Sequence, residues 1–262
     1  MECRLGLIQL AAGDDKAANL QAARREIDRA VAAGAELVIL PEMFCVPYET
    51  ARFADYAEAE GGEAQQMLAA AARDNACWLV GGSICEEEDG RYYNTSYVYD
   101  PQGQCVAKHR KMHLFDIDIE GGQYFKESDV LSPGTSLTVF DTPWGRVGLA
   151  ICFDIRFADM AAAMVDEGAR LLIYPASFNM STGPRHWELL FRGRAMDGQC
   201  YAVGVAPARD ENASYVSWGH SLVVNPWAEV VCDLGTAPET RVVSIDLDLV
   251  QAVRRQIPLG RQ

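Results

Sequence analysis

Positive charge is what this sequence lacks. Its 262 residues carry 23 lysines and arginines against 37 aspartates and glutamates, which gives a formal net charge of −14. A chain of this sign repels phosphate backbones and anionic lipid, so we expect neither nucleic acid nor a membrane surface as a partner. A small acidic substrate is still allowed, because a few local cations can reverse the field inside a cleft.

Paired cysteine motifs are also absent, although the chain has eight cysteines. None forms a Cys-x-x-Cys pair, and several stand in apolar runs, as Cys77 does before Trp78. That pattern is typical of buried free thiols in a reducing compartment and argues against a disulfide framework. Met1 to Arg4 shows no basic or apolar leader, and no apolar run of the sequence is long enough to span a bilayer. We therefore predict a cytoplasmic protein.

No low-complexity linker or shift in composition divides the chain. Hydrophobic residues make up 49% of it, which is enough to fill a large core. The length is within the range of layered α/β folds. We predict a single domain over residues 1–262.

The first forty residues have the pattern of a βαβ unit. Arg4 to Leu10 is predicted to be a buried strand, and Asp14 and Asp15 are candidate N-caps for the helix that follows. Gly34 is predicted to end that helix, and Leu37 to Leu40 forms the second strand. Strands joined in this way are parallel. Apolar residues at helical spacing mark the buried face of the helix: Leu20, Ala23, Ile27, Ala30 and Val31.

The same unit returns in the second half of the sequence. Arg146 to Leu149 resembles Arg4 to Leu7, and Gly168 to Pro175 resembles Gly34 to Pro41. A helix over residues 157–167 would connect the second pair of strands. This repeat predicts two related βαβ halves. The fold class that follows is α/β, a four-layer α-β-β-α sandwich in which helices cover the outer faces of two sheets.

Further elements are predicted outside the two halves. Asp100 to Gly103 is predicted to be a turn, and Arg185 to Asp197 a helix. The other predicted strands cover residues 78–84, 92–99, 104–108, 201–205, 217–224 and 242–245.

Cys152 is the first candidate for chemistry. It follows a predicted buried strand and precedes Phe153 to Arg156, which lead into a helix. Backbone dipoles at such a place favour a thiolate, and backbone N–H groups there can stabilise an oxyanion. Considered alone, the position is explained better by a buried, inert cysteine.

Glu42 is the second candidate. It follows Pro41 at the end of the second strand of the first half. Ligands bind outside the carboxyl ends of parallel strands, so Glu42 and Cys152 reach one cleft if the two halves pack face to face. A carboxylate placed there can act as a general base toward a thiol or toward water. A solvated loop carboxylate is the alternative.

A basic cluster provides the third candidate. Five of the six residues from Lys108 to His113 are basic or imidazole side chains. A lysine here can stabilise a tetrahedral oxyanion and protonate a leaving amine, while a solvated turn is the alternative. A Cys–His pair of Cys152 with His113 is a weaker rival. A metal site, the other rival, would use His109, His113, Asp116 and Asp118.

With these residues assembled, the chain resembles the nitrilase, or carbon–nitrogen hydrolase, superfamily over almost its whole length. The three signature neighbourhoods of that superfamily stand in order as Leu40-Pro41-Glu42, Arg110 to Phe115 and Ile151 to Phe157.

The resemblance implies an amide hydrolase that uses neither a metal nor an organic cofactor. It places a Glu–Lys–Cys triad on Glu42, Lys111 and Cys152, and a second glutamate on Glu127, which would position Lys111 or the substrate amide. The implied reaction is a two-stage acyl transfer through a thioester on the cysteine. Lys111 and the N–H of Phe153, the first after the nucleophile, would hold the oxyanion. The resemblance also implies a homodimer or a larger homo-oligomer.

Within the superfamily the likeness is greatest to the omega-amidase branch, whose members hydrolyse the terminal amide of 2-oxoglutaramate or 2-oxosuccinamate. Three departures leave the triad untouched: Met43 after the glutamate, Gly121-Gly122 in place of a proline-bearing turn, and Ala228 in place of a glycine. The supporting runs are residues 113–118, 182–190, 206–210, 218–221 and 224–227.

The far carboxylate of such a substrate needs a cation or free N–H and O–H donors. Arg156 is the first candidate, although the interpretation we favour is a structural ion pair with Asp154 or Asp159. Two other functions stay open: an amidase for deaminated glutathione or an N-carbamoyl amine, and a non-catalytic binding protein on the same fold. The remaining candidates for substrate contacts are Tyr48, Phe153, Thr182 and Arg185.

Overall fold

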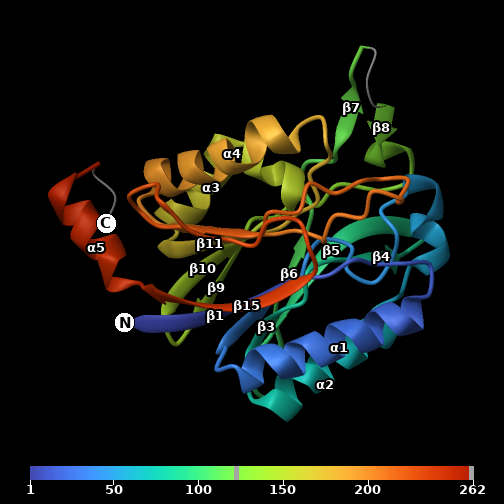
Figure 1. Ribbon diagram of the computed structural model, residues 1–262, viewed down its shortest axis with the longest axis horizontal. Helices are drawn as coiled ribbons and strands as arrows, with labels where there is room; N and C mark the ends of the chain where they lie inside the picture. The colour runs from blue at the N-terminus through green and yellow to red at the C-terminus, as the bar shows by residue number, and fades with distance from the viewer. Residues whose placement is uncertain (121–123, 260–262) are drawn as a thin grey trace.

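The structure, a computed structural model, describes residues 1–120 and 124–259, so that Gly121 and Gly122 lie outside the described residues. Two β-sheets pack face to face and helices cover their outer faces (Figure 1). The predicted four-layer α-β-β-α sandwich is therefore confirmed. No helix of the described residues is long and apolar enough to cross a membrane.

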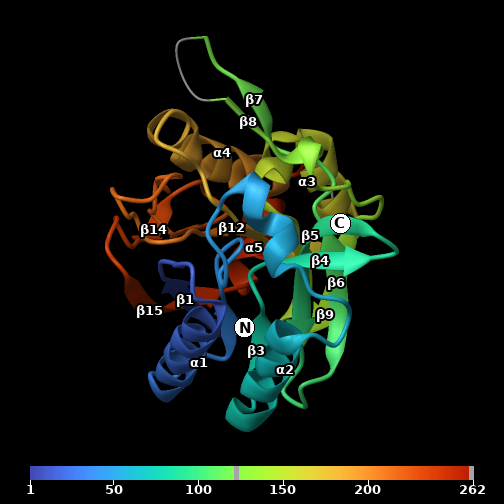
Figure 2. The same cartoon turned by 90° about the vertical axis from the view of Figure 1, so that its right-hand side faces the viewer.

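The first sheet contains the first βαβ half. Its strands are β1 (Glu2–Gln9), β2 (Leu37–Ile39), β3 (Trp78–Val80), β4 (Ile84–Glu88), β5 (Arg91–Tyr99), β6 (Cys105–Arg110) and β15 (Glu239–Asp246). Their order in space is β15-β1-β2-β3-β5-β4, and β6 also pairs with β5. The helices α1 (Lys16–Ala32) and α2 (Glu63–Asn75) lie side by side on the outer face of this sheet (Figure 2).

The second sheet contains the second half. Its strands are β9 (Thr138–Thr142), β10 (Gly145–Leu149), β11 (Ala169–Pro175), β12 (Tyr201–Val205), β13 (Leu222–Val224) and β14 (Val230–Asp233). They follow the order β14-β13-β12-β11-β10-β9. The helices α3 (Ala158–Asp166) and α4 (Gly183–Gly198) cover it, and α5 (Asp248–Gln256) lies at one end of the molecule (Figure 1).

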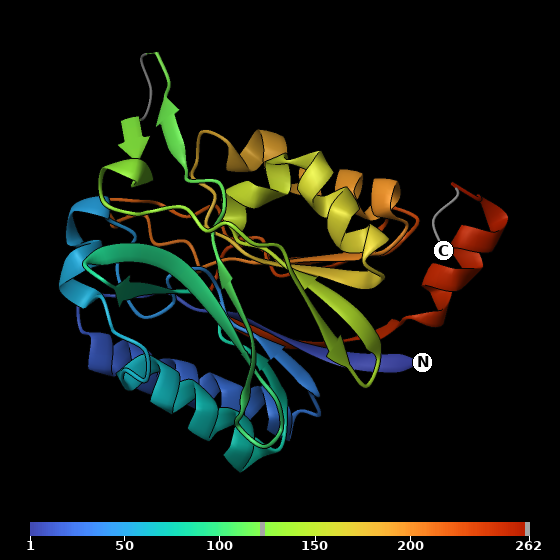
Figure 3. The same ribbon diagram turned by 180° about the vertical axis from the view of Figure 1, so that it is seen from behind.

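A small hairpin projects from the sandwich (Figure 3). It pairs β7 (Asp116–Asp118) with β8 (Tyr124–Lys126) in antiparallel fashion. Three short 3₁₀ helices complete the fold: η1 (Thr50–Tyr56), η2 (Glu127–Asp129) and η3 (Cys152–Arg156). The hairpin lies between β6 and η2 in the sequence, and it therefore separates two segments that meet again at the site described below.

The two halves form as the sequence predicts. The carboxylate of Asp15 accepts the N–H of Ala18 at 3.0 Å and caps α1. Gly34 and Gly168 follow α1 and α3 with φ of +98° and +97°, which glycine adopts without strain. β1 pairs in parallel with β2, and β10 pairs in parallel with β11. The βαβ repeat is thus present in the backbone as well as in the sequence.

Three apolar clusters hold the layers together. The central one lies between the sheets and includes Leu5, Leu37, Leu149 and Ile173. The outer two bury the inner faces of the helices, around Ile27 and Leu68 on one side and around Met164, Trp187 and Phe191 on the other. Each sheet is covered on both faces, and its central parallel strands are accordingly continuous apolar runs.

The predicted strand over residues 78–84 is wrong, because the chain breaks at Gly81 and Gly82 into β3 and β4. Gly82 has φ of +59°, and a Cβ atom there would lie 2.1 Å from the carbonyl oxygen of Pro41. The close approach of two backbone segments, and not the local pattern, therefore ends the strand. β13 is also shorter than predicted. The helices and strands that we did not predict from the sequence are α2, α5, β4, β7, β8, β9 and β14.

Ala228, which stands where the family resemblance leads us to expect a glycine, has φ of +60°. The left-handed backbone region explains why a glycine suits this position.

Gly82 provides a test of how tightly the chain is packed beneath Pro41. We expect Gly82→Ala to lower the free energy of unfolding by roughly 1–3 kcal/mol more than Gly90→Ala, because overpacking against a fixed backbone costs about that much. Gly90 is the matched control: its φ is +73°, similar to that of Gly82, but nothing lies within 4 Å of its Cβ position. Urea denaturation of both variants measures the difference, and equal losses of stability would contradict the prediction.

Candidate active site

Glu42 is held where the end of β2 meets the turn after β3. The Ser83 N–H donates to the Pro41 carbonyl at 3.2 Å, and the Met43 N–H donates to Ser83 Oγ at 2.9 Å. These bonds fix the backbone on both sides of Glu42, and its side chain is fully buried. Glu42 therefore does not lie in solvent, as the alternative interpretation required.

Cys152 lies at the end of β10, on the other sheet. It begins η3 with φ of +46°, a strained conformation for a residue that carries a Cβ. Asp154 stabilises this turn because its Oδ2 accepts the N–H of Ile151 at 3.0 Å. The thiol is buried against Ser177, which follows β11. Ser177 donates its N–H to Sγ at 3.5 Å, and Sγ lies 3.8 Å from the Ser177 carbonyl oxygen.

Lys111 follows β6, and its side chain is fully buried. Its N–H donates to the Asn94 carbonyl at 2.8 Å, which anchors it to β5. Its ammonium lies 2.9 Å from Glu42 Oε1 and 2.9 Å from Glu127 Oε1. Glu127 begins η2, and its other oxygen accepts the N–H of Phe115 at 2.7 Å. The structure thus brings together the four residues that the family resemblance selected.

The two oxygens of Glu42 have different surroundings. Oε1 accepts from Asn94 Nδ2 at 2.8 Å, from Lys111 at 2.9 Å and from the Tyr48 hydroxyl at 3.1 Å. Oε2 is buried and accepts no hydrogen bond from any residue that the structure describes. One oxygen is therefore saturated, and the other keeps its lone pairs available for a proton.

Burial raises the pKa of Glu42, and the charge of Glu127 raises it further, while Lys111 lowers it; the net shift is upward. Burial alone would lower the pKa of Lys111, but Glu127 and Glu42 outweigh it and raise that pKa, so the ammonium stays charged.

Burial and the charge of Glu42 also raise the pKa of the Cys152 thiol well above its ordinary value, against the opposing effects of Lys111 and the Ser177 N–H. The expectation that backbone dipoles favour a thiolate in the resting state is therefore wrong. A neutral thiol needs a base, and Glu42 is the carboxylate that influences its pKa.

The candidates for substrate contacts are placed differently from one another. The Tyr48 hydroxyl lies 2.8 Å from Glu127 Oε1 and 3.1 Å from Glu42 Oε1, so it serves the two carboxylates. Phe153, next to Cys152, packs at a tilt against the ring of Phe115 and edge-on against that of Phe157. The Thr182 hydroxyl donates to Asn179 Oδ1 at 2.9 Å at the start of α4. Arg185 is exposed and donates to the Ser181 carbonyl at 2.8 Å.

Arg156 does not form the ion pair that we favoured. No carboxylate among the described residues pairs with it, and its guanidinium lies near His186 Nδ1, at 3.2 Å and 3.3 Å. Its carbon Cζ lies 5.4 Å from the ring of Phe153 and 5.2 Å from that of Phe178. Nε is buried without a partner in the part of the chain that the structure describes. Burial lowers the pKa of Arg156, and a negative charge on Cys152 would act against that effect, so the guanidinium lies within electrostatic reach of this sulfur.

The contacts of Asp154 explain why it does not pair with Arg156. They also argue against the two rival sites, the Cys–His pair and the metal site. Its oxygens accept from His109 Nε2 at 3.1 Å and lie 2.8 Å from His113 Nδ1, besides the N–H groups of Ile151 and His113. Both imidazoles are thus bound to Asp154, and neither pairs with Cys152. Over residues 1–120 and 124–259, no group of three His, Cys, Asp or Glu side chains is arranged to hold a metal ion.

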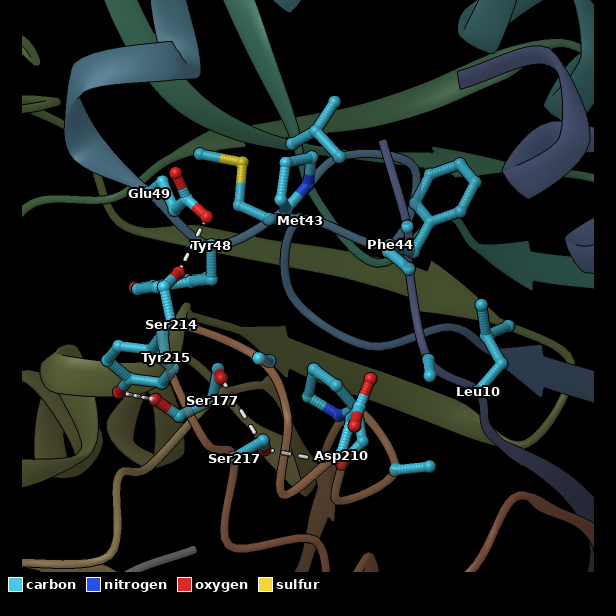
Figure 4. A pocket seen from close by; sticks show the side chains of 18 of the residues that line it. Leu10, Met43, Phe44, Tyr48, Glu49, Ser177, Asp210, Ser214, Tyr215 and Ser217 are labelled. Atoms are coloured by element: carbon cyan, nitrogen blue, oxygen red, sulfur yellow. Dashed lines mark hydrogen bonds between the residues drawn. The ribbon is translucent and has the colours of Figure 1, made fainter. Parts of the chain in front are cut away.

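A cavity of about 310 Å³ opens beside Glu42 and Ser177 (Figure 4). It lies at the carboxyl ends of β1, β2, β11 and β12, and its volume suits a small molecule. Asp14, Glu49 and Asp210 line it, and no lysine, arginine or histidine of the described residues does.

Three residues at the site were missed by sequence reasoning: Asn94, Ser177 and Tyr215. Asn94 lies within β5, where nothing in the local pattern distinguishes it. Ser177 had a usable signal, because it follows the strand that repeats β2.

All eight cysteines are free in the structure, as predicted, and Cys105 is the exposed one. The absence of disulfides agrees with the spacing of the cysteines in the sequence.

Comparison with known proteins identifies the family of the chain. The carbon–nitrogen hydrolase family model matches residues 4–255. The chain is 49% identical to the omega-amidase NIT2 of Danio rerio and 50% identical to that of Bos taurus, over 99% of this chain and 94% of each relative. It is also similar to the crystal structure of Saccharomyces cerevisiae Nit3, a member of branch 10 of the nitrilase superfamily. The TM-score is 0.92 at 37% identity, over 100% of this chain and 96% of Nit3. The chain belongs to the carbon–nitrogen hydrolase family.

Proposed function

We propose that the protein is an omega-amidase. It hydrolyses the terminal amide of 2-oxoglutaramate or 2-oxosuccinamate to the 2-oxo acid and ammonia, through a thioester on Cys152. The names of the relatives support the activity. The observation that carries the mechanism is the free oxygen of Glu42, Oε2, which is buried beside a neutral thiol. The other oxygen of the same carboxylate, Oε1, is saturated by Lys111, Asn94 and Tyr48.

In the first stage Glu42 Oε2 takes the thiol proton while the sulfur bonds to the amide carbon. The raised pKa of Glu42 makes this carboxylate a better base toward a thiol than an ordinary one. Lys111 and the N–H of Phe153 stabilise the oxyanion. When the oxyanion collapses, the carbon–nitrogen bond breaks and the proton held by Glu42 passes to the leaving nitrogen, which departs as ammonia. The thioester remains.

In the second stage the same carboxylate takes a proton from water, and the oxygen of that water bonds to the thioester carbon. The carbon–sulfur bond then breaks, the sulfur recovers a proton and the carboxylic acid leaves. Glu127 holds the Lys111 ammonium throughout, because its contact with the Phe115 N–H fixes it independently of the substrate.

Arg156 binds the far carboxylate of the substrate in this proposal. It is a half-buried guanidinium near Cys152 that no carboxylate of the described residues neutralises. The wall of the neighbouring cavity carries carboxylates and would repel that end of the substrate. In this proposal Phe153 and Thr182 contact the substrate beside Arg156, and Tyr48 acts on the carboxylates instead.

Residues 1–262 form one catalytic domain in this proposal, which acts as a homodimer or larger homo-oligomer in the cytoplasm. The outer face of α4 supports an assembly, since Leu189 and Met196 lie seven residues apart on one side of the helix and are 69% and 58% exposed. Light scattering on the purified protein measures the molar mass, which distinguishes a monomer from a dimer or a larger oligomer.

Replacing the nucleophile is the direct test. We expect Cys152→Ala to lower ammonia release from 2-oxoglutaramate by at least about 10³-fold, because no other described group forms the acyl intermediate. Cys105→Ala removes an exposed thiol and serves as the control with normal activity. Mass spectrometry of the intact protein should find an acyl adduct on wild type and none on Cys152→Ala. Full activity of Cys152→Ala would refute the mechanism.

A panel of amides tests the substrate in the same assay. Glutamine lacks the keto group of 2-oxoglutaramate and should be a poor substrate. A higher kcat/KM for deaminated glutathione or an N-carbamoyl amine would replace the omega-amidase assignment, and no ammonia from any amide would favour a binding protein.

The raised pKa of Glu42 sets the acid limb of the pH profile. The base works as a carboxylate, so kcat/KM should fall as the pH drops through that pKa, which lies above the ordinary value of about 4.3. Asn94→Ala removes a donor to the ionised form and should move the limb to higher pH. A limb at or below the ordinary value, or one that does not move in Asn94→Ala, would contradict this role of Glu42.

Arg156→Leu tests the carboxylate site. We expect kcat/KM for 2-oxoglutaramate to fall about 10- to 100-fold, the effect of losing a hydrogen bond between charged groups. The methyl ester of the same substrate, which lacks the charge, should lose much less. Arg185→Leu is the matched control, because Arg185 is exposed and bonded to a backbone carbonyl. Equal losses for acid and ester would show that Arg156 does not recognise the carboxylate.

A further inference from the structure

Ser177 presents both ends of its backbone to the nucleophile. Its N–H donates to Cys152 Sγ at 3.5 Å, and its carbonyl oxygen lies 3.8 Å from the same sulfur. The two contacts have opposite effects on chemistry. The N–H stabilises negative charge on sulfur, whereas the carbonyl competes with Glu42 for the thiol proton. How this serine is oriented therefore bears on the ease of the first proton transfer.

Tyr215 holds that carbonyl. Its hydroxyl donates to the Ser177 oxygen at 2.6 Å, a much shorter contact than that of the sulfur (Figure 4). The ring is buried between Tyr48, at 4.6 Å, and Phe125, at 5.3 Å, so the hydroxyl cannot easily turn away. The segment itself is fastened to the loop after β11, because the N–H of Trp218 donates to the Phe178 carbonyl at 2.7 Å.

We infer that Tyr215 is a positioning residue for the nucleophile: by occupying the Ser177 carbonyl it directs the Cys152 thiol proton toward Glu42 and keeps the Ser177 N–H on the sulfur. The inference deepens the proposed function and rests on it for the role of Cys152. It concerns a residue that touches neither the substrate amide nor the carboxylates by a hydrogen bond, and that lies 63 residues from the nucleophile in sequence.

The proton balance explains why this contact matters. The buried thiol has two acceptors within reach, the free oxygen of Glu42 and the carbonyl of Ser177. A proton shared with an amide carbonyl cannot be transferred, because that oxygen is a very weak base. Without the Tyr215 hydroxyl, the Ser177 carbonyl would accept a full hydrogen bond from the thiol. Glu42 would then receive the thiol proton less often.

Tyr215→Phe removes the hydroxyl and keeps the ring. Tyr174→Phe is the matched control, because the Tyr174 hydroxyl is also buried and forms no hydrogen bond with any described residue. Two quantities are measured for both variants and for wild type. One is kcat/KM for ammonia release from 2-oxoglutaramate. The other is the pH dependence of iodoacetamide alkylation at Cys152, followed on its peptide by mass spectrometry.

We expect Tyr215→Phe to lower kcat/KM roughly three- to tenfold, the ratio that corresponds to one hydrogen bond. We also expect its alkylation profile to move to higher pH, because the thiolate loses stabilisation. Tyr174→Phe should change neither. A merely structural role would lower activity or stability without moving the alkylation profile, so an unmoved profile in Tyr215→Phe overturns the inference, as does an equal shift in Tyr174→Phe.

The alkylation measurement separates this inference from the proposed function. If wild type releases no ammonia from any amide, the proposed function fails, while the alkylation profile still reports how Tyr215 acts on the thiol.

Discussion

The whole site depends on one buried ammonium. Lys111 has no exposed surface, and a charge can be buried only when opposite charges and hydrogen bonds replace the water it loses. Glu42 and Glu127 replace it, each at 2.9 Å. The loops that carry these three residues follow β2, β6 and β8, so the packing of the sandwich is what brings them together. Loss of either carboxylate would leave the buried ammonium with one carboxylate partner in place of two.

The same charge arrangement determines the reactivity of the sulfur. Burial raises the pKa of both Glu42 and Cys152, and a neighbouring carboxylate raises each further: Glu127 acts on Glu42, and Glu42 acts on Cys152. An ordinary carboxylate would be far too weak a base for a buried thiol. Raising the pKa of the base reduces that mismatch, and the stabilisation that Lys111 provides becomes available to the oxyanion as the reaction proceeds.

The sequence allowed us to predict whatever is local or repeated. The βαβ halves, the N-cap at Asp15 and the glycine after each helix all follow from patterns of a few residues. Long-range contacts were not predictable. The strand break at Gly82 depends on the carbonyl of Pro41, forty-one residues away, and the position of Arg156 depends on His109 and His113, which bind the carboxylate of Asp154. The thiolate expectation failed for the same kind of reason, since it considered a backbone dipole and not the burial that outweighs it.

The repeat also explains why a chain with two similar halves has one site. The alignment of Arg4 to Leu7 with Arg146 to Leu149 places Leu10 opposite Cys152, and that of Pro41 with Pro175 places Ala176 opposite Glu42. Each half therefore supplies one reactive group and has an apolar residue at the other position. Leu10 lines the cavity beside the site, where the symmetry-related nucleophile would stand. In the proposed mechanism the base comes from one sheet and the nucleophile from the other, so neither half is chemically complete, and catalysis requires the two sheets to pack face to face.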